Sequence, residues 1–540
     1  MNTFSSSAQT FSLVAFSAIA SFTLLLCIIN SAERDDLSDY YTGYRGMSSI
    51  PNGLAIAGDY ISAATILNTV GFIALTGFDG LTLALSSALS LVLLMFLLAE
   101  PLRNAGRFTM GDALARHASD RKVRIVSSAV TLLALVPMMI VQLAASGYLV
   151  SLILGFDGDA IRTGCIVVLG ILMIAYAAIG GMKGTALIQI IKIVVLVGAS
   201  AALAFLIMNK VGWNPSQLLS DAKTGSRVGD AYLTSGMRFG SDGMGKLDTV
   251  SAMVTVVLGA ACLPHVTMRM YTAHSARHIR RSMSWAVGTV SVVCFLLAII
   301  GFGAAAIIGR DALAAGGPQG TLAILQVSQG VAEGSSMVAT LLFTAVAAAV
   351  FLTLLSSVSG MIMACASSLA HDFYALGLRR TSLPAVRELR AARAAAVAVG
   401  VPAIALAIAV QDWGLQALIT LSLCIGASAI APALVYRLFW RRYTNTGLLY
   451  TMIGGTLSVL VLLAFSEVVS GGEHALITDR NFSWFPMHTT GLVTIPLGFF
   501  LGWLGTIRST RRDQDDQERQ YEAAEPRILA GAGTGSGSGS

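Results

Sequence analysis

The stretch GLAIAGDYISAATILN, residues 53–68, contains one charged residue, Asp59, among apolar, small and hydroxylated neighbours. The chain then continues through VGFIALTGF (70–78) without another charge. An ionised Asp at the centre of a membrane helix costs about 2.5–3.5 kcal/mol. The stretch therefore either lies outside a membrane, or its carboxylate has a function inside one.

Composition favours the membrane. The chain has 540 residues, of which 55% are hydrophobic and 12% charged, and its mean hydropathy is +0.74; soluble domains carry about 25% charged residues. Because a membrane helix needs about 20 apolar residues, we expect an all-α integral membrane protein with about 13 transmembrane helices, and the long apolar runs exclude a β-barrel. The thirteen expected spans are 11–29, 53–78, 81–99, 125–154, 163–182, 186–208, 247–264, 283–308, 337–370, 394–410, 413–436, 448–466 and 490–507.

The basic residues are distributed unevenly between the two sides of these spans. Of the 35 Lys and Arg residues, 26 fall in segments on one side and 8 on the other. We therefore expect a multi-pass protein of the cell (inner) membrane. The positive-inside rule places its N-terminus outside the cell and its C-terminus in the cytoplasm. The same distribution argues against nucleic acid as a partner, despite a net charge of +6. The six cysteines lie inside spans without paired spacing, which favours packing over metal or disulfide use.

Two of the expected spans contain helix breakers. In the second span, Gly53 and Gly58 precede Asp59. In the seventh span, Gly259 is followed by Pro264. Spans five apart cross the membrane in opposite directions, and interrupted helices at corresponding positions of two inverted halves indicate a transporter's binding site. The alternative is that Gly and Pro are simply frequent in membrane helices.

We therefore predict a five-plus-five inverted-repeat transporter core with one extra helix before it and two after. The loop at 209–246 is expected to be either a folded cap or a solvated connector, and the charged tail either disordered or a short surface helix. The final Gly/Ser-rich residues are expected to be a linker without a function of its own. The expected parts are the extra helix 1–30, the first repeat 50–208, the extracellular loop 209–246, the second repeat 247–440, the two C-terminal helices 448–507, the cytoplasmic tail 508–530 and the linker 531–540.

Hydroxyl groups on the ninth span are candidates for ion binding. Thr353, Ser356 and Ser357 share one helix face, at positions i, i+3 and i+4. They could complete a cation site with carbonyls freed by a helix break, or bond back to carbonyls of their own helix. Lys192 lies about two turns into the sixth span, from where its side chain could extend back towards the cytoplasm.

Five motifs in order resemble the sodium:solute symporter family, and most closely its acetate or short-chain monocarboxylate permease branch. The resemblance runs from about residue 40 to about residue 440. It is carried by NGLAIAGDYISAAT (52–65), FDGL (78–81), GGMKGT with Gln189, Ile190 and Lys192 (180–192), LPH with Arg269 (263–269) and ASSLAHDFYA (366–375).

The resemblance implies a sodium site between the second and ninth spans. Its ligands are expected to be the backbone carbonyls of Ala57, Tyr60 and Thr353 and the hydroxyls of Ser356 and Ser357. With that family context, cation binding is favoured over back-bonding for the two serines, and Na+ over H+ as the coupling ion.

One residue departs from the family pattern. Gln189 stands where many family members carry an Asp, so we expect a single coupling ion. His265, at the end of the broken seventh span, is a candidate gate or proton site, with a structural role at the membrane interface as the alternative.

The substrate site is expected beside the sodium ion. A small carboxylate needs hydrogen-bond donors, which amides and a helix N-terminus at the break can supply. Ser62, Ala63 and Thr65 follow the break directly, and Asp59 is expected to satisfy free amides there. Gln142 on the fourth span is a further donor, or alternatively ties two helices together.

These residues predict a secondary active symporter that imports short-chain monocarboxylates (acetate, propionate, pyruvate) coupled to Na+ by alternating access, and not an enzyme. Its expected partners are a small carboxylate substrate and the lipid bilayer. The alternatives are an H+-coupled monocarboxylate permease, or a sodium symporter for another small solute such as an amino acid. A transporter-like sensor, a channel or a structural subunit are further alternatives from other classes.

Overall fold

The computed structural model describes residues 6–30, 37–43, 46–115, 120–155, 158–315, 320–331, 336–379, 384–411, 413–471, 475–477 and 480–530. The expected linker at 531–540 lies outside these residues. Within them the chain is helical, with isolated β-bridges such as Ser466 to Phe485 in place of any sheet. The all-α prediction is therefore confirmed.

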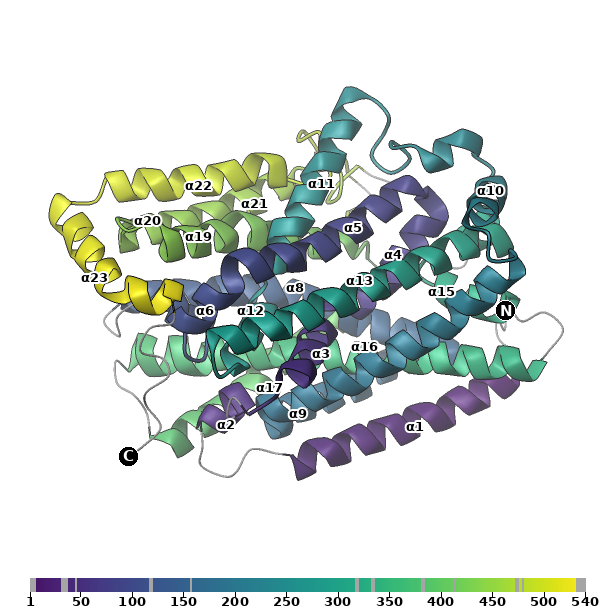
Figure 1. Cartoon of the computed structure of the whole chain (residues 1–540), viewed down its shortest axis with the longest axis horizontal. Coiled ribbons are helices and arrows are strands. Elements are labelled where there is room, and N and C mark those ends of the chain that lie inside the picture. Colours follow the sequence, from purple (N-terminus) through teal and green to yellow (C-terminus); the bar gives the residue numbers. More distant parts are fainter. Residues whose placement is uncertain are drawn as a thin grey trace.

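The helices form one bundle whose members run mostly along the long axis of the molecule (Figure 1). The bundle helices are α1 (Ser6–Ile29), α3 (Ser49–Tyr60), α4 (Ala63–Thr76), α5 (Phe78–Leu93), α6 (Ala99–Ala105), α8 (Arg121–Leu154), α9 (Asp159–Lys210), α11 (Gly243–Cys262), α13 (Ala276–Ile307), α16 (Ser336–Ser367), α17 (Ala385–Ala409), α18 (Gln416–Ile425), α19 (Ala431–Phe439), α20 (Asn445–Leu449), α21 (Gly455–Ala464) and α22 (Gly491–Ile507). The other helices are α2 (Leu37–Thr42), α7 (Met110–Leu114), α10 (Pro215–Ser226), α12 (Pro264–Thr267), α14 (Arg310–Ala315), α15 (Ala323–Gly330) and α23 (Arg511–Ala530). Short 3₁₀ or π segments continue several of them: Leu94–Leu98, Gly229–Leu233, Met268–Thr272, Ser368–Leu378, Gly426–Ile430 and Tyr450–Gly454.

Ten helices of the described chain are long and apolar enough to cross a membrane, or up to twelve if each of two bent pairs is one span. This tally counts α9 once, although its 52 residues would extend about 78 Å as a straight helix. Gly181, with φ 54°, breaks the helix where the sequence predicts a turn between two spans. The tally supports a multi-pass membrane protein but does not confirm the number thirteen.

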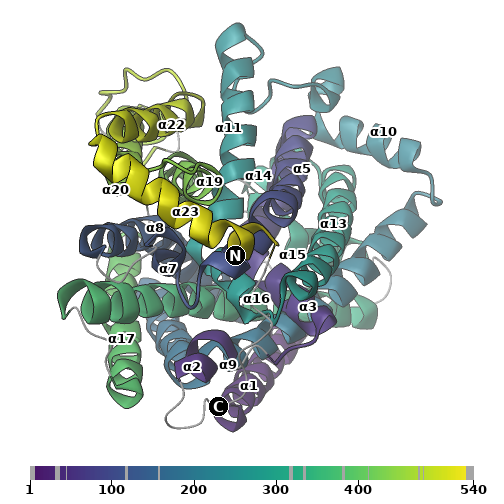
Figure 2. The same ribbon diagram turned by 60° about the vertical axis from the view of Figure 1, so that its left-hand side comes forward.

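Burial separates the inner helices from the outer ones. In Figure 2, α16 lies within the bundle while α1 and α17 lie at its periphery. About two-thirds of the residues in the most apolar part of the α16 span are buried, against about a fifth of those in the most apolar part of α1. Phe11, Val14 and Phe22 of α1 are exposed, which is expected for side chains that face lipid. The residues predicted to bind substrate and ion lie on the inner helices.

The segment 209–246 is a folded cap, so the first of its two expected forms is the one found. Its helix α10 packs along α13, and the Tyr232 hydroxyl donates to the Ile73 carbonyl at 2.6 Å. The Asp79 carboxylate accepts backbone N–H groups of Gly236 and Arg238 at 3.1 and 2.8 Å. The cap is thereby fixed to the start of α5.

The charged tail forms a surface helix, α23. Of its two expected forms, a short surface helix or a disordered segment, the helix is the one found. It bends 110° away from α22 and packs on α6. Tyr521 donates to the Leu438 carbonyl at 2.8 Å, and Arg437 donates to Gln517 at 3.1 Å. Figure 1 shows α10 and α23 at opposite ends of the bundle, as the predicted topology requires of an outside cap and a cytoplasmic tail.

Candidate functional site

The first helix break lies where the sequence places it, between α3 and α4. The two helices meet at 63°. Ser62 caps α4: its hydroxyl accepts the Thr65 N–H at 3.1 Å, and the Thr65 hydroxyl accepts the Ser62 N–H at 3.4 Å. This reciprocal pair is a capping box, which stabilises a new helix start directly after an interrupted one. The N-terminus of α4 therefore points into the break.

The second break lies between α11 and α12. α11 ends at Cys262, and Leu263 adopts an extended conformation, with φ −59° and ψ 132°. Proline disfavours helical geometry in the residue before it, so Pro264 explains the break at Leu263 and begins the short α12. Both predicted interruptions are therefore present.

Asp59 is buried at the end of α3 and bonds to two side chains from other helices. Its Oδ2 forms an ion pair with Nε of Arg269, and its Oδ1 accepts a hydrogen bond from Nε2 of Gln189. The Gln189 amide also donates to the Ser356 carbonyl at 3.0 Å. The carboxylate thus links the two broken regions to α9 and α16, instead of binding free amides at the break as the sequence led us to expect.

The side chain of Lys192 is fully buried, so the prediction that it extends to the cytoplasm is wrong. Its Nζ donates to the Ile61 carbonyl at 2.8 Å and to the Ser357 hydroxyl at 3.3 Å. Ile61 lies in the break itself, where its carbonyl has no following helical turn to bond with. The ammonium therefore binds the break and α16 together.

The five predicted sodium ligands lie on α3 and α16, the helices that flank this region. The Ala57 carbonyl accepts the Ile61 N–H at 3.0 Å, and the Ser356 hydroxyl donates to the Leu352 carbonyl at 2.7 Å. Thr353 makes the equivalent bond to Ala349 at 2.6 Å. A hydroxyl that donates in this way keeps lone pairs for a cation, so back-bonding and ion binding are compatible. The carbonyl and hydroxyl oxygens fit the chemistry of Na+, while Lys192 places a positive charge beside Ser357.

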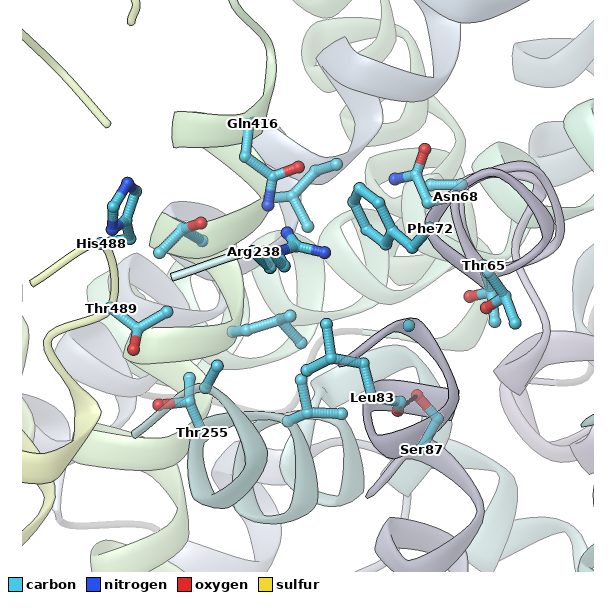
Figure 3. A pocket seen from close by; sticks show the side chains of 18 of the residues that line it. Thr65, Asn68, Phe72, Leu83, Ser87, Arg238, Thr255, Gln416, His488 and Thr489 are labelled. Carbon is cyan, nitrogen blue, oxygen red and sulfur yellow. Dashed lines mark hydrogen bonds between the residues drawn. The ribbon is translucent and has the colours of Figure 1, made fainter. Parts of the chain in front are cut away.

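A cavity of about 1000 Å³ extends from the first break towards the cap (Figure 3). Ser62, Thr65, Asn68 and Phe72 line it along α4. Glu467 and His488, whose side chains are 49% and 39% exposed, also line it, so the cavity reaches the molecular surface. A solute could therefore enter from the end of the bundle that carries the cap.

Only some of the residues predicted to bind substrate line this cavity. Ser62 and Thr65 line it, whereas Asp59, Ala63 and Gln142 do not. Gln142 is fully buried on α8, and neither its amide nitrogen nor its oxygen has a hydrogen-bond partner among the described residues. His265 lines both the cavity and a much smaller void that also contacts Asp59. It separates the cavity from the Asp59–Arg269 pair.

Charged residues also gather at the other end of the bundle. Asp112, His371 and Asp372 lie close enough together to share a metal ion, but Arg124 donates to both aspartates, at 3.0 and 3.2 Å. Burial favours a neutral Asp112, yet the hydrogen bonds and charges of His371 and Arg124 hold its pKa well below the usual range. The geometry is that of an ion-pair network linking α7, α8 and the π-helical end of α16.

The comparisons agree with this geometry. The family model described as "Sodium:solute symporter family" matches residues 40–455. The chain is 34% identical over 504 residues to an uncharacterized symporter, YwcA, of Bacillus subtilis, covering 93% of this chain and 95% of that protein. It is also 34% identical over 530 residues to a monocarboxylic acid transporter of Corynebacterium glutamicum, covering 95% and 93%.

Solved structures show the same fold. A Na+-coupled sialic acid symporter in a substrate-bound outward-open state matches with a TM-score of 0.71 and 16% identity, covering 93% of this chain and 98% of that one. The nucleobase-cation-symport transporter Mhp1 matches with a TM-score of 0.52 and 13% identity, covering 92% and 100%. The predicted inverted-repeat transporter fold is thus confirmed, and the protein is a membrane transporter and not an enzyme. The chain belongs to the sodium:solute symporter family.

Proposed function

We propose that this sodium-coupled symporter imports short-chain monocarboxylates such as acetate, propionate and pyruvate. The observation that carries the proposal is the cavity that descends from the cap and ends at the capped start of α4. Hydroxyl and amide donors of Ser62, Thr65 and Asn68 line its inner part, and a helix N-terminus there favours an anion. The monocarboxylic acid transporter relative, at 34% identity, supports this substrate class.

The proposed sodium site lies beside the substrate and uses the carbonyls of Ala57, Tyr60 and Thr353 with the hydroxyls of Ser356 and Ser357. Tyr60 is the last residue of α3, so its carbonyl lies at the break, while the Ala57 carbonyl keeps its bond from the Ile61 N–H and offers its second lone pair. Gln142 remains a further proposed donor although it does not line the cavity, because burial without a partner costs free energy that a bound group would recover. Asp59 acts through charge, holding Arg269 and Gln189 in place next to both sites.

Transport by alternating access requires the inner end to be closed while the cavity is open to the cap. His265, as the proposed gate, and the Asp59–Arg269 pair lie between the cavity and the opposite end of the bundle. Beyond them, the Asp112, Arg124 and Asp372 network joins the helices at that end. The proposed orientation places the cap outside the cell membrane and this network at the cytoplasm, so the structure corresponds to an outward-facing state.

Uptake into proteoliposomes tests the proposal. Labelled acetate, propionate and pyruvate are offered under separately imposed Na+ and H+ gradients. We expect accumulation under the Na+ gradient alone, abolished when a sodium ionophore collapses it. Accumulation driven by H+ alone and indifferent to Na+ would exclude sodium coupling of these solutes, and no accumulation of any monocarboxylate would exclude the substrate class.

A further inference from the structure

Two arginines that no membrane-spanning helix supplies line the cavity, Arg310 of α14 and Arg238, and of the two Arg238 has a buried nitrogen without a hydrogen-bond partner in the described chain. Arg238 belongs to the cap, and it lies among residues of α4, α11 and α18 in the cavity lining (Figure 3). Two buried cations near the first break, Lys192 and Arg269, are instead bound at the break and at Asp59. A carboxylate entering the cavity therefore meets Arg238 as a fixed charge delivered from outside the helices.

The guanidinium of Arg238 lies over an aromatic ring. Its Cζ lies 3.7 Å from the centroid of Phe72, and its backbone N–H is fixed by Asp79 at 2.8 Å. Stacking of this kind positions a guanidinium while leaving its edge free for hydrogen bonds. Phe72 shares one side of α4 with Thr65 and Asn68, which lie seven and four residues before it, so the arginine lies along the path to the break.

Within the described chain Asp79 and Asp248 interact with the charge of Arg238 from a distance, but neither carboxylate contacts its guanidinium. Its Nη1 is buried and has no hydrogen-bond partner there, and no ion pair involves it. Asp79 is occupied by backbone N–H groups of the cap, and Asp248 by His488 and Thr489, at distances of 2.7–3.1 Å. Burial lowers the pKa of Arg238 to about 10, so the side chain stays charged at neutral pH. A buried guanidinium N–H group without an acceptor costs free energy, and an anionic ligand at Nη1 would remove that cost.

We propose that Arg238 binds the substrate carboxylate in the outer part of the cavity and makes the transporter selective for anions over neutral solutes of the same shape. The inference rests on the proposed function, whose substrate class it explains. Charge-assisted bonds from a guanidinium to a carboxylate are short and strong, while the amide analogue of the same acid carries no charge to pair. The cap thus has a recognition role as well as a structural one.

The experiment measures labelled propionate uptake into proteoliposomes under a Na+ gradient, for the wild type, Arg238→Gln, Arg238→Lys and Arg227→Gln. Loss of one charge-assisted interaction raises the half-saturating propionate concentration of Arg238→Gln about 10- to 100-fold, with a smaller rise for Arg238→Lys. Arg227→Gln removes the same charge from the same cap, but at a side chain that is 75% exposed and paired with Asp311, so it behaves as the wild type. Propionamide competes poorly in the wild type, and the preference for propionate narrows in Arg238→Gln.

A second measurement reports ligand binding directly, so that a variant that no longer transports can still be tested. Propionate and Na+ are each tested for their shift of the thermal unfolding midpoint of the purified protein. We expect Arg238→Gln to keep the Na+ shift and to lose most of the propionate shift. Wild-type affinity for propionate in Arg238→Gln, by uptake or by this shift, overturns the inference and leaves the proposed function intact. A wild type that neither accumulates nor binds monocarboxylates overturns both.

Discussion

Arg269 and Asp59 form a buried ion pair that joins the region after the second helix break to the end of α3 at the first. The two residues are 210 positions apart, and each side chain is only 2% exposed. The pair therefore connects the interrupted helices of the two inverted halves at their centre. A change in the relative position of the halves must act on this contact or carry it along as a unit.

Removing one partner should destabilise the protein strongly. Asp59→Asn leaves Arg269 buried without its counter-charge, at an expected cost of about 3–5 kcal/mol in the free energy of unfolding. Arg269→Gln should cost a similar amount, and the double variant less than the sum, because the two changes remove the same interaction. Unfolding of the purified single and double variants in detergent measures the cycle.

An exposed ion pair serves as the control for that cycle. Arg227 and Asp311 lie at the surface, with side chains 75% and 67% exposed. Exposed pairs contribute little, so Arg227→Gln should leave the unfolding transition unchanged. Strictly additive effects of Asp59→Asn and Arg269→Gln would contradict a direct coupling between them.

The serines of α16 provide a prediction about sodium. Ser356→Ala and Ser357→Ala each remove a proposed ligand, so the Na+ concentration for half-maximal uptake should rise severalfold while substrate affinity at saturating Na+ changes little. Ser367→Ala is the matched control, because Ser367 is equally buried on the same helix and its hydroxyl bonds back to Met363 at 2.7 Å. If all three variants share one sodium dependence, Ser356 and Ser357 are not ligands.

Lys192 should oppose sodium binding. Its ammonium donates to Ser357, one of the proposed ligands, and like charges at this separation in a protein interior repel by an amount on the order of kcal/mol. Lys192→Met should therefore lower the half-maximal Na+ concentration, although the protein loses stability because the Ile61 carbonyl is left without its donor. The measurement is the sodium dependence of uptake. A higher Na+ requirement in Lys192→Met would show that the ammonium supports the site.

Local signals in the sequence were enough to predict both helix breaks and the fold. They were not enough to predict which side chains from distant parts of the chain bind each other. Pro264 acts on the residue before it, so that interruption can be read from a short window of sequence. Gly58 and Gly259 lie inside α3 and α11, close to the breaks, where they allow close packing against Gln189 and Leu423. Arg269 lies in a run of basic residues that the positive-inside rule already explains, and nothing in the sequence marks it as the partner of Asp59.

The surroundings of two other cations, Lys192 and Arg238, could not be predicted from the sequence for the same physical reason. Lys192 was expected to reach the cytoplasm because a flexible side chain usually can, but Ile61 and Ser357 provide oxygens within the bundle. Arg238 lies in the loop 209–246, where its position between Met237 and Phe239 is the only local signal of partial burial. In each case the partners come from elements that are far apart in the chain.

Gly360 tests how closely α16 must approach Asp59. A Cβ at this position would lie 2.7 Å from Oδ1 of Asp59, the oxygen that Gln189 binds. Gly360→Ala should therefore displace the carboxylate, cost about 1–3 kcal/mol through overpacking and reduce sodium-driven uptake well below that of the wild type. Gly198→Ala on α9 is the control, because its Cβ would meet nothing within 4 Å and alanine favours a helix over glycine. Wild-type uptake and stability in Gly360→Ala would mean that the Asp59 carboxylate can move freely, and that the contact between α3 and α16 is not part of the transport mechanism.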